Sequence, residues 1–239
     1  MYPFETWLSQ AQDHLDKTGR PLVSLCYAQS LDGSLSDQPG KPLKLSGPQS
    51  SELTHQLRSL HAAILVGVGT VLADNPRLTA RLPGRKTSIP QPRPVVLDSA
   101  LRTPSTARLI QGAEKSPWIA ATSAAPEDRR AALLAAGVEI MDLPVDAQGK
   151  VSLPDLLVCL GQRGISSLMV EGGARVLQAF LAQKLADQVI ITIAPLFLGG
   201  VPVIEPWGRI IQQPLRMIEV GSQQLGADLV IWGQCMAPA

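Results

Sequence analysis

The stretch AAILVGVGTVLADNPRLTAR at residues 62–81 decides the fold that we expect of this chain. It opens with a continuous apolar run, 62–68, which is typical of a strand buried on both faces. Gly67 and Gly69 end that run in a glycine turn, where the missing Cβ atoms let the backbone approach a ligand closely. The stretch then adds one carboxylate and two guanidinium groups: Asp74, Arg77 and Arg81. This order indicates a site at the carboxyl end of a parallel sheet, although a strand followed by a turn and a polar loop has the same pattern.

The composition of the chain describes a globular protein with ample material for a core. Hydrophobic residues make up 45% of the 239 residues and charged residues 17%, which argues against a disordered chain. The formal net charge is only +1, and no basic block is present, so nothing indicates a nucleic acid or an anionic membrane as partner. No apolar run approaches the roughly 18 residues of a membrane span, and the acidic N-terminus does not resemble a signal peptide.

The cysteines and histidines argue against a metal site and a disulfide framework. The chain has three of each, without CxxC or HExxH spacing: Cys26, Cys159, Cys235, His14, His55 and His61. We therefore expect no metal, and free thiols that suit a reducing, cytoplasmic compartment.

Strand and helix patterns alternate along the chain. Phe4, Leu8, Ala11 and Leu15 recur at helical spacing before Gly19, which predicts one helix within 1–19 that packs on the body. Buried strands are predicted at 22–28, 62–68, 94–99, 117–122, 138–143, 166–170 and 189–193. Helices are predicted at 46–60, 126–137, 153–163 and 174–185. Two last strands, 215–220 and 227–232, are expected to pair antiparallel. The pattern predicts one α/β domain over 1–239 with a mostly parallel central sheet flanked by helices and a C-terminal antiparallel hairpin.

Three local signals refine this outline. Ser46 and Gln49 have the spacing of a capping box at the start of the helix that ends near Leu60. Asp32 precedes Gly33 in a turn signal, so turn chemistry alone accounts for it, although a functional carboxylate is the alternative. Glu171, Gly172 and Gly173 join a strand to a helix, and the free N–H groups at such a helix end suit a phosphate.

The chain lacks the sequence motifs of several enzyme classes. The chain has no GxSxG nucleophile elbow, no GxxxxGK[ST] loop and no HxE with PCxxC, and it completes only half of GxGxxG at 67–72. The remaining polar candidates are Arg58, Thr70, Asp74, Arg81 and Glu171. These residues offer phosphate donors but no nucleophile–base pair, which fits a nucleotide-dependent hydride transfer in which the cofactor supplies the chemistry.

Five segments in a fixed order resemble the reductase domain of the riboflavin-biosynthesis deaminase-reductase. They are SLDG at 30–33, LR at 57–58, AILVGVGTVLADNPRLTAR at 63–81, VVLDS at 95–99 and VEGGARVL at 170–177. The resemblance covers nearly the whole chain from about residue 20 onward. It implies a dihydrofolate-reductase-like fold and a cytoplasmic homodimer. It also implies the NADPH-dependent reduction of 5-amino-6-(5-phosphoribosylamino)uracil to its ribitylamino form.

The resemblance also implies roles for individual residues. NADPH would be contacted by Ala28, Thr70, Asp74, Ser99, Gly173, Ala174, Arg175, Val176 and Leu177. The substrate would be held by Arg58, Leu78, Arg81 and Glu171, the arginines suiting its 5′-phosphate because a guanidinium can grip phosphate oxygens in pairs. Asp74 is the candidate for proton transfer, with Asp32 as the second choice.

The chain departs from the family pattern at three positions. Pro42 and Lys44 stand where the family usually has a substrate-binding serine and a cofactor-binding tryptophan, and Asn75 stands where it often has aspartate. The deaminase half is also missing, which implies a stand-alone reductase. These departures leave two alternatives open: a reductase of a different small substrate, and a non-catalytic NADP-binding relative.

Overall fold

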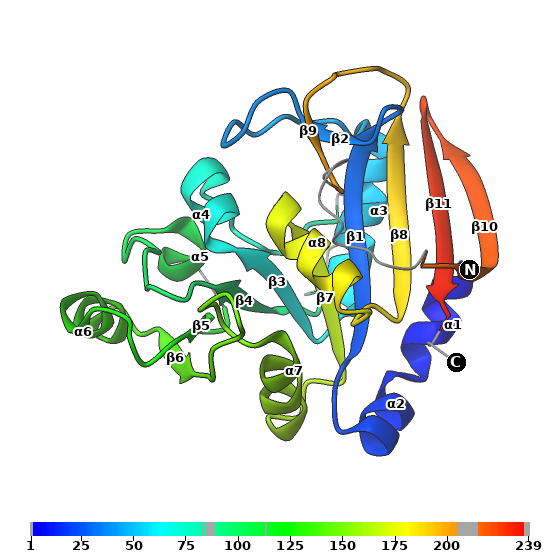
Figure 1. The fold of residues 1–239 in the computed structure, drawn as a ribbon. Coiled ribbons are helices and arrows are strands. Elements are labelled where there is room, and N and C mark those ends of the chain that lie inside the picture. The colour runs from blue at the N-terminus through cyan, green and yellow to red at the C-terminus, as the bar shows by residue number, and fades with distance from the viewer. Residues whose placement is uncertain (1, 83, 85–88, 113, 205–214, 237–239) are drawn as a thin grey trace.

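The computed structural model describes residues 2–82, 84, 89–112, 114–204 and 215–236 (Figure 1). One nine-stranded sheet runs through the molecule in the order β10-β11-β8-β1-β7-β3-β4-β5-β6. Its strands are β1 (Leu22–Ser30), β3 (Ala63–Gly67), β4 (Arg93–Leu97), β5 (Trp118–Ala121), β6 (Glu139–Asp142), β7 (Ser167–Gly172), β8 (Gln188–Ala194), β10 (Met217–Leu225) and β11 (Asp228–Cys235). The seven strands from β8 to β6 are parallel, and the β10–β11 hairpin joins β8 antiparallel. The predicted α/β architecture is confirmed.

Helices cover both faces of this sheet. They are α1 (Pro3–Ser9), α2 (Ala11–Thr18), α3 (Pro48–Leu60), α4 (Val68–Asp74), α5 (Arg108–Gln111), α6 (Glu127–Ala135), α7 (Leu153–Gln162) and α8 (Ala174–Ala182). Short strands β2 (Ser34–Ser36) and β9 (Val201–Pro202) pair separately. Among the helices of the described ranges, none has the length and hydropathy of a membrane span. We propose that 1–239 forms one domain, because a single sheet connects its parts.

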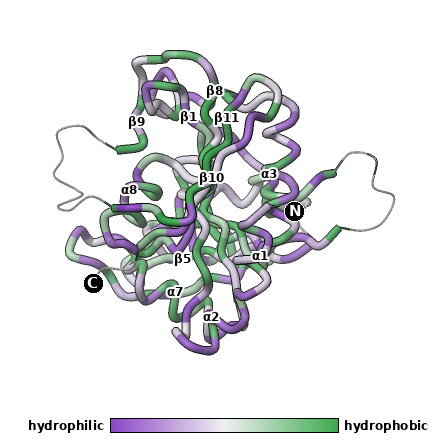
Figure 2. Tube along the Cα trace, turned by 90° about the vertical axis from the view of Figure 1, so that its right-hand side faces the viewer, coloured by the Kyte–Doolittle hydropathy of each residue, from purple (hydrophilic) through white to green (hydrophobic). Residues whose placement is uncertain are grey.

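Alternate residues of the central strands enter different cores, as the pleat requires. In β3, Ala63 and Leu65 belong to the core formed with α7 and α8, whereas Ile64 and Val66 belong to the core formed with α4, α5 and α6. A third core joins α1 and α3 to β1, β7, β8 and β11. Seen from the β10 edge, hydrophobic residues concentrate along the strands (Figure 2). Burial on both faces explains why these strands read as continuous apolar runs.

Two local predictions were wrong, one at the start of the chain and one after β3. The predicted N-terminal helix is two helices, α1 and α2, because Gln10 leaves helical geometry (φ −93°, ψ 5°). This break lets α1 pack Phe4 edge-on against Trp232. The glycine turn after β3 is instead the start of α4, with Gly67 as its N-cap.

The predicted capping box at Ser46 does not form. The N-cap of α3 is Gly47, without a side-chain cap. Asp228 of β11 takes that role from a distance of 181 residues, since its carboxylate accepts the Gly47 N–H at 2.8 Å and the Ser50 hydroxyl. The start of α3 therefore depends on the C-terminal hairpin. Part of the expected loop at 82–94 lies outside the described residues.

A buried polar cluster connects the end of α3 to the sheet. His61 donates from Nδ1 to the Leu57 carbonyl (2.7 Å) and accepts at Nε2 from Ser24 (2.8 Å), which also accepts from Gln188 (2.6 Å). Every member is almost completely buried. Burial lowers the pKa of His61 to about 4, so the imidazole is neutral in the folded protein.

We predict that this histidine weakens the fold in acid. Because the folded pKa is about 4 and the ordinary value 6.5, protonation favours the unfolded chain. The stability that the fold gains from a neutral His61 is fully present above pH 6.5. It is lost as the pH falls toward 4, and the total loss in the free energy of unfolding is roughly 3 kcal/mol. Urea unfolding of wild type and His61→Gln at several pH values checks this: the stability difference between the two should shrink as the pH falls. A constant difference would contradict it.

Candidate functional site

An ion pair between α3 and β7 forms the centre of the candidate site. Arg58 donates from Nε to Oε1 of Glu171 at 2.5 Å and from Nη2 to Oε2 at 2.6 Å, and a third N–H reaches the Thr79 carbonyl at 3.1 Å. The side chains are only 14% and 13% exposed. Burial alone would lower the pKa of Arg58, but the Glu171 carboxylate outweighs it and raises the pKa. With three of its five N–H groups committed, Arg58 positions Glu171 more than it offers itself to a phosphate.

Arg81 is the freer cation of this site. It donates from Nη1 to the Thr79 hydroxyl at 2.7 Å, and its Nη2 lies 3.3 Å from Nε2 of His55. Partial burial lowers the pKa of Arg81, and so does the positive charge of three neighbours, Arg58, Arg77 and Arg108; only Glu171 acts in the opposite sense. Four guanidinium groups against one carboxylate, itself paired, leave an excess of positive charge that suits a phosphate.

A cavity of about 150 Å³ lies beside the ion pair, between α3 and the ends of β1 and β8. Ala28, Ser46, Thr54, Thr192 and Glu171 are among the residues that line it. Pro42 and Lys44, two of the three departures from the family pattern, are exposed and do not line it. The loop therefore presents Ser46 to the cavity, a residue that the sequence suggested only as a helix cap.

The predicted cofactor residues gather at the neighbouring strand ends. Gly173, the N-cap of α8, has φ 75° and is exposed, and a Cβ there would come 3.1 Å from Oγ1 of Thr70. Gly67 is required for packing, because a Cβ would lie 2.8 Å from Val176. The side chain of Leu177 is fully buried, so only the backbone of this turn can face a ligand. Ala174 and the exposed Arg175 begin the helix, which leaves N–H groups free for a phosphate.

Four further predicted residues have different surroundings. Ser99 uses its Oγ to accept the Val151 N–H at 3.1 Å. Leu78 is 2% exposed and packs in the core, so only its backbone could meet a substrate. Asp74 is exposed at the end of α4, and partial desolvation raises its pKa. Asn75, in the left-handed region (φ 43°), accepts the Arg108 N–H through its side chain at 2.8 Å, which an aspartate could also do.

Asp32 holds two loops together. It accepts hydrogen bonds from the hydroxyls of Ser30 and Ser34 and from the N–H groups of Leu198 (3.0 Å) and Gly199 (2.7 Å). These bonds, led by that from Ser30, hold the pKa of Asp32 well below its usual range. A carboxyl that stays ionised is a poor proton donor, which favours the structural alternative for this residue.

The thiols offer no nucleophile at the site. All three cysteines are free, and burial raises the pKa of Cys26, beside the cavity, well above its usual value. Among the described residues, no three or more His, Cys, Asp or Glu side chains lie together in a way that could hold a metal ion.

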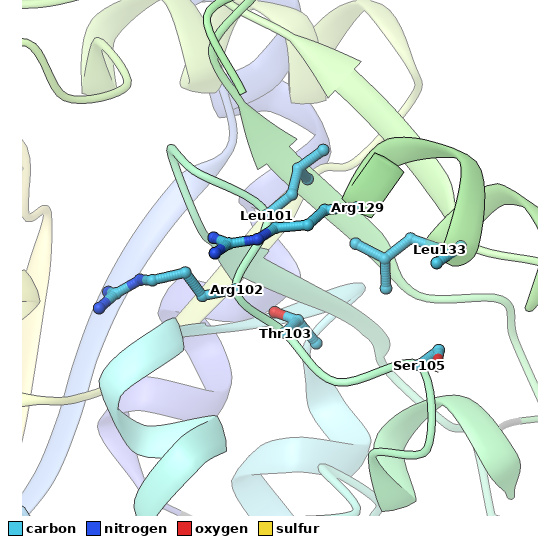
Figure 3. Close-up of a pocket in the computed structure, with 7 residues that line it drawn as sticks. Leu101, Arg102, Thr103, Ser105, Arg129 and Leu133 are labelled. Carbon is cyan, nitrogen blue, oxygen red and sulfur yellow. The ribbon is translucent and has the colours of Figure 1, made fainter. Parts of the chain in front are cut away.

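A second cavity, of about 280 Å³, lies where β4 leads into the 98–103 turn (Figure 3). Arg129 reaches across from α6 and donates to the Ala100 carbonyl at 3.2 Å, with Arg102 beside it. Thr103 is already occupied, because its hydroxyl donates to Asp98 at 2.8 Å. Within the described part of the chain, neither arginine has an ion-pair partner. Neither arginine was among the site residues expected from the sequence, and His55 was considered there only as a metal ligand.

The helical spacing of His55 and Arg58 was the one local signal for the missed histidine, because residues three apart share a helix face. The two arginines of the second cavity have no such signal, since they come from different elements.

Comparisons with known proteins agree with this geometry. Residues 21–231 match the model of the RibD C-terminal domain. A relative from Archaeoglobus fulgidus, named 2,5-diamino-6-ribosylamino-4(3H)-pyrimidinone 5′-phosphate reductase, is 36% identical over 187 residues, which are 76% of this chain and 83% of the relative. The structure of Acinetobacter baumannii RibD matches with TM-score 0.82 and 25% identity, over 96% of this chain and 62% of that one.

The riboflavin biosynthesis reductase Rib7 of Saccharomyces cerevisiae matches over the full length of its structure, with TM-score 0.73, 28% identity and 98% of this chain covered. This chain therefore spans all of a stand-alone reductase but less than two thirds of a RibD chain. The dihydrofolate-reductase-like fold that the sequence implied is confirmed. The chain belongs to the RibD C-terminal domain family, the reductase family of riboflavin biosynthesis.

Proposed function

We propose that this protein is an NADPH-dependent reductase that converts a ribosylamino-pyrimidine 5′-phosphate to its ribitylamino form. The observation that carries this proposal is the Arg58–Glu171 pair with the cationic cluster around Arg81 on one side and the exposed start of α8 on the other. The pyrimidine is either the aminouracil that the sequence resemblance names or the diaminopyrimidinone of the archaeal relative. Assays with both substrates decide between them.

The chain's residues would orient the substrate rather than react with it. Bound NADPH would supply a hydride to the sugar C1′ of the opened, imine-like substrate, and the nitrogen would take up a proton. Arg81 would hold the 5′-phosphate, and Glu171, fixed by Arg58, would accept hydrogen bonds from the substrate. Asp74 remains our candidate for moving the proton, because a raised pKa keeps more of the acid form near neutral pH.

The cavity lining argues against the alternative of a non-catalytic relative. One ground for that alternative was Pro42 at the position of a substrate-binding serine, but Pro42 lies outside the cavity beside Glu171, which Ser46 lines. The hydroxyls of Ser46, Thr54 and Thr192 provide the polar lining that a pyrimidine needs.

We predict that Glu171→Gln and Arg81→Ala each lower kcat/KM by roughly 30-fold, about 2 kcal/mol, as expected for the loss of a charged hydrogen bond. The oxidation of NADPH at its absorbance band, with either pyrimidine phosphate as substrate, measures this. Arg163→Ala is a matched control, because Arg163 pairs with Glu139 on the surface. Unchanged turnover in both site variants would overturn the substrate assignment, and so would an equal loss in the control.

The second cavity supports the preference for NADPH over NADH. In the sheet order β7-β3-β4-β5, the start of α8 follows β7 and the Arg102 turn follows β4, two strand spacings or roughly 10 Å away. A dinucleotide laid along this edge would bring its adenosine end toward Arg102 and Arg129. These two guanidinium groups, which form no ion pair with the described residues, suit its 2′-phosphate.

We predict that Arg102→Ala weakens NADPH binding roughly tenfold, the size of one charged hydrogen bond, and leaves NADH binding unchanged. Equilibrium titration of protein fluorescence with each cofactor measures both affinities. Arg130→Ala is the control, since Arg130 is held by Asp142 at 2.7 Å. An equal effect on NADPH and NADH would show that this cavity does not recognise the 2′-phosphate.

We also propose a homodimer. β10 is the edge of the sheet and exposes Ile218 and Val220 (45% and 58%), so its edge is a surface on which a second copy can pair. Light scattering coupled to size exclusion should give the dimer mass for wild type and the monomer mass for Val220→Lys. A wild-type monomer at micromolar concentration would contradict the proposal.

A further inference from the structure

We propose that His55 is a second ligand of the substrate phosphate, donating from Nε2–H beside the Arg81 guanidinium. The inference rests on the proposed function, because the phosphate belongs to the proposed substrate. It adds a binding residue to that site and a dependence of affinity on pH.

The position of His55 is set by two elements. It lies on α3 one turn before Arg58, so both side chains face the segment that follows α4. The backbone N–H of Arg81 points at Nδ1 of His55 with a distance of 3.3 Å, and Nη2 of the same arginine lies 3.3 Å from Nε2. Both ring nitrogens therefore face N–H groups of Arg81.

A neutral imidazole cannot accept at both nitrogens, because one of them carries a proton. The Arg81 backbone N–H has a fixed direction, so Nδ1 is the acceptor and the proton resides on Nε2. That proton then faces the Nη2 donor of Arg81, and the Thr79 carbonyl is the one acceptor that the described residues place near the ring, so no acceptor among them lies between the two donors. An anionic oxygen placed between them would accept from both, and this mismatch is the observation that points to a ligand.

The surrounding charges favour a doubly charged anion as the ligand. Arg77 and Arg108 add to the positive charge at Arg81, while Glu171 is already paired with Arg58. A phosphate has enough oxygens to accept from Nε2 of His55 and from Arg81 at once.

The same charges make the contact pH-dependent. Burial lowers the pKa of His55, and so do Arg58 and Arg81; Glu171 and the Thr79 carbonyl act in the opposite sense. The free site therefore holds a neutral histidine at pH 7. A bound dianion would raise that pKa, so binding should take up a proton and should tighten as the pH falls from 8 toward 6.5.

The experiment is a calorimetric titration with ribose 5-phosphate in buffers of different ionisation enthalpy. His55→Ala should weaken binding roughly tenfold, the effect of one charge-assisted hydrogen bond. His55→Gln keeps an N–H donor but cannot titrate, so it should restore most of the affinity and abolish the proton uptake. His14→Ala is the matched control, because His14 lies on α2 beside Asp187 and should change neither quantity. Thermal unfolding of each variant verifies that it is folded.

Steady-state kinetics separate a phosphate ligand from a structural residue. In His55→Ala, the KM for the phosphorylated pyrimidine should rise while kcat and the affinity for NADPH stay unchanged. The kcat/KM for the dephosphorylated substrate should also stay unchanged. Wild-type affinity for ribose 5-phosphate in His55→Ala would overturn the inference, and so would full proton uptake in His55→Gln.

Two outcomes distinguish this inference from the proposed function. Turnover of a pyrimidine phosphate with an affinity that ignores His55 would reject the inference and leave the function standing. Binding of ribose 5-phosphate that requires His55, without turnover of either pyrimidine, would support the phosphate site and reject the function.

Discussion

Burial of the central strands on both faces is the constraint on which the rest of this structure depends. Ala63, Ile64 and Leu65 of β3 are fully inaccessible, and Leu168, Met169 and Val170 of β7 are equally buried. Charged groups cannot occupy such strands without a large desolvation cost, so the polar chemistry moves to the strand ends. Glu171 comes at the end of β7, and Thr70 follows β3 on α4. The site is therefore a consequence of how the sheet is covered.

The ion pair between Arg58 and Glu171 then sets the arrangement of the polar groups at these strand ends. Two mostly buried charges that meet through two short hydrogen bonds recover much of their desolvation cost, whereas either one alone would be costly. The pair joins α3 to β7 and brings the adjoining cavity, the Thr79 carbonyl and Arg81 into one arrangement. Because Arg58 serves Glu171, the excess positive charge remains with Arg81 and the arginines near it.

Two other carboxylates hold loops in place by accepting hydrogen bonds. Asp32 connects the end of β1 to the 198–199 backbone, and Asp228 caps the start of α3 by accepting the Gly47 N–H. Each carboxylate oxygen can accept more than one hydrogen bond, so one aspartate can satisfy several backbone groups that no local helix or sheet serves. These contacts position the loops around the cavity without taking part in the proposed chemistry.

The sequence by itself determined the order of strands and helices, the parallel sheet and the residues at the strand ends, because apolar runs and glycines act over a few residues. It also singled out Arg58, Thr70 and Glu171 as members of one candidate site. Only the tertiary structure decided that Arg58 serves Glu171, 113 residues away, that Asp228 caps α3 and that Ser46 lines the cavity in place of Pro42. The sites of His55, Arg102 and Arg129 were likewise recognised only in the tertiary structure. Their surroundings come from segments distant in the chain, and the direction of a side chain there is set by packing, which no local pattern records.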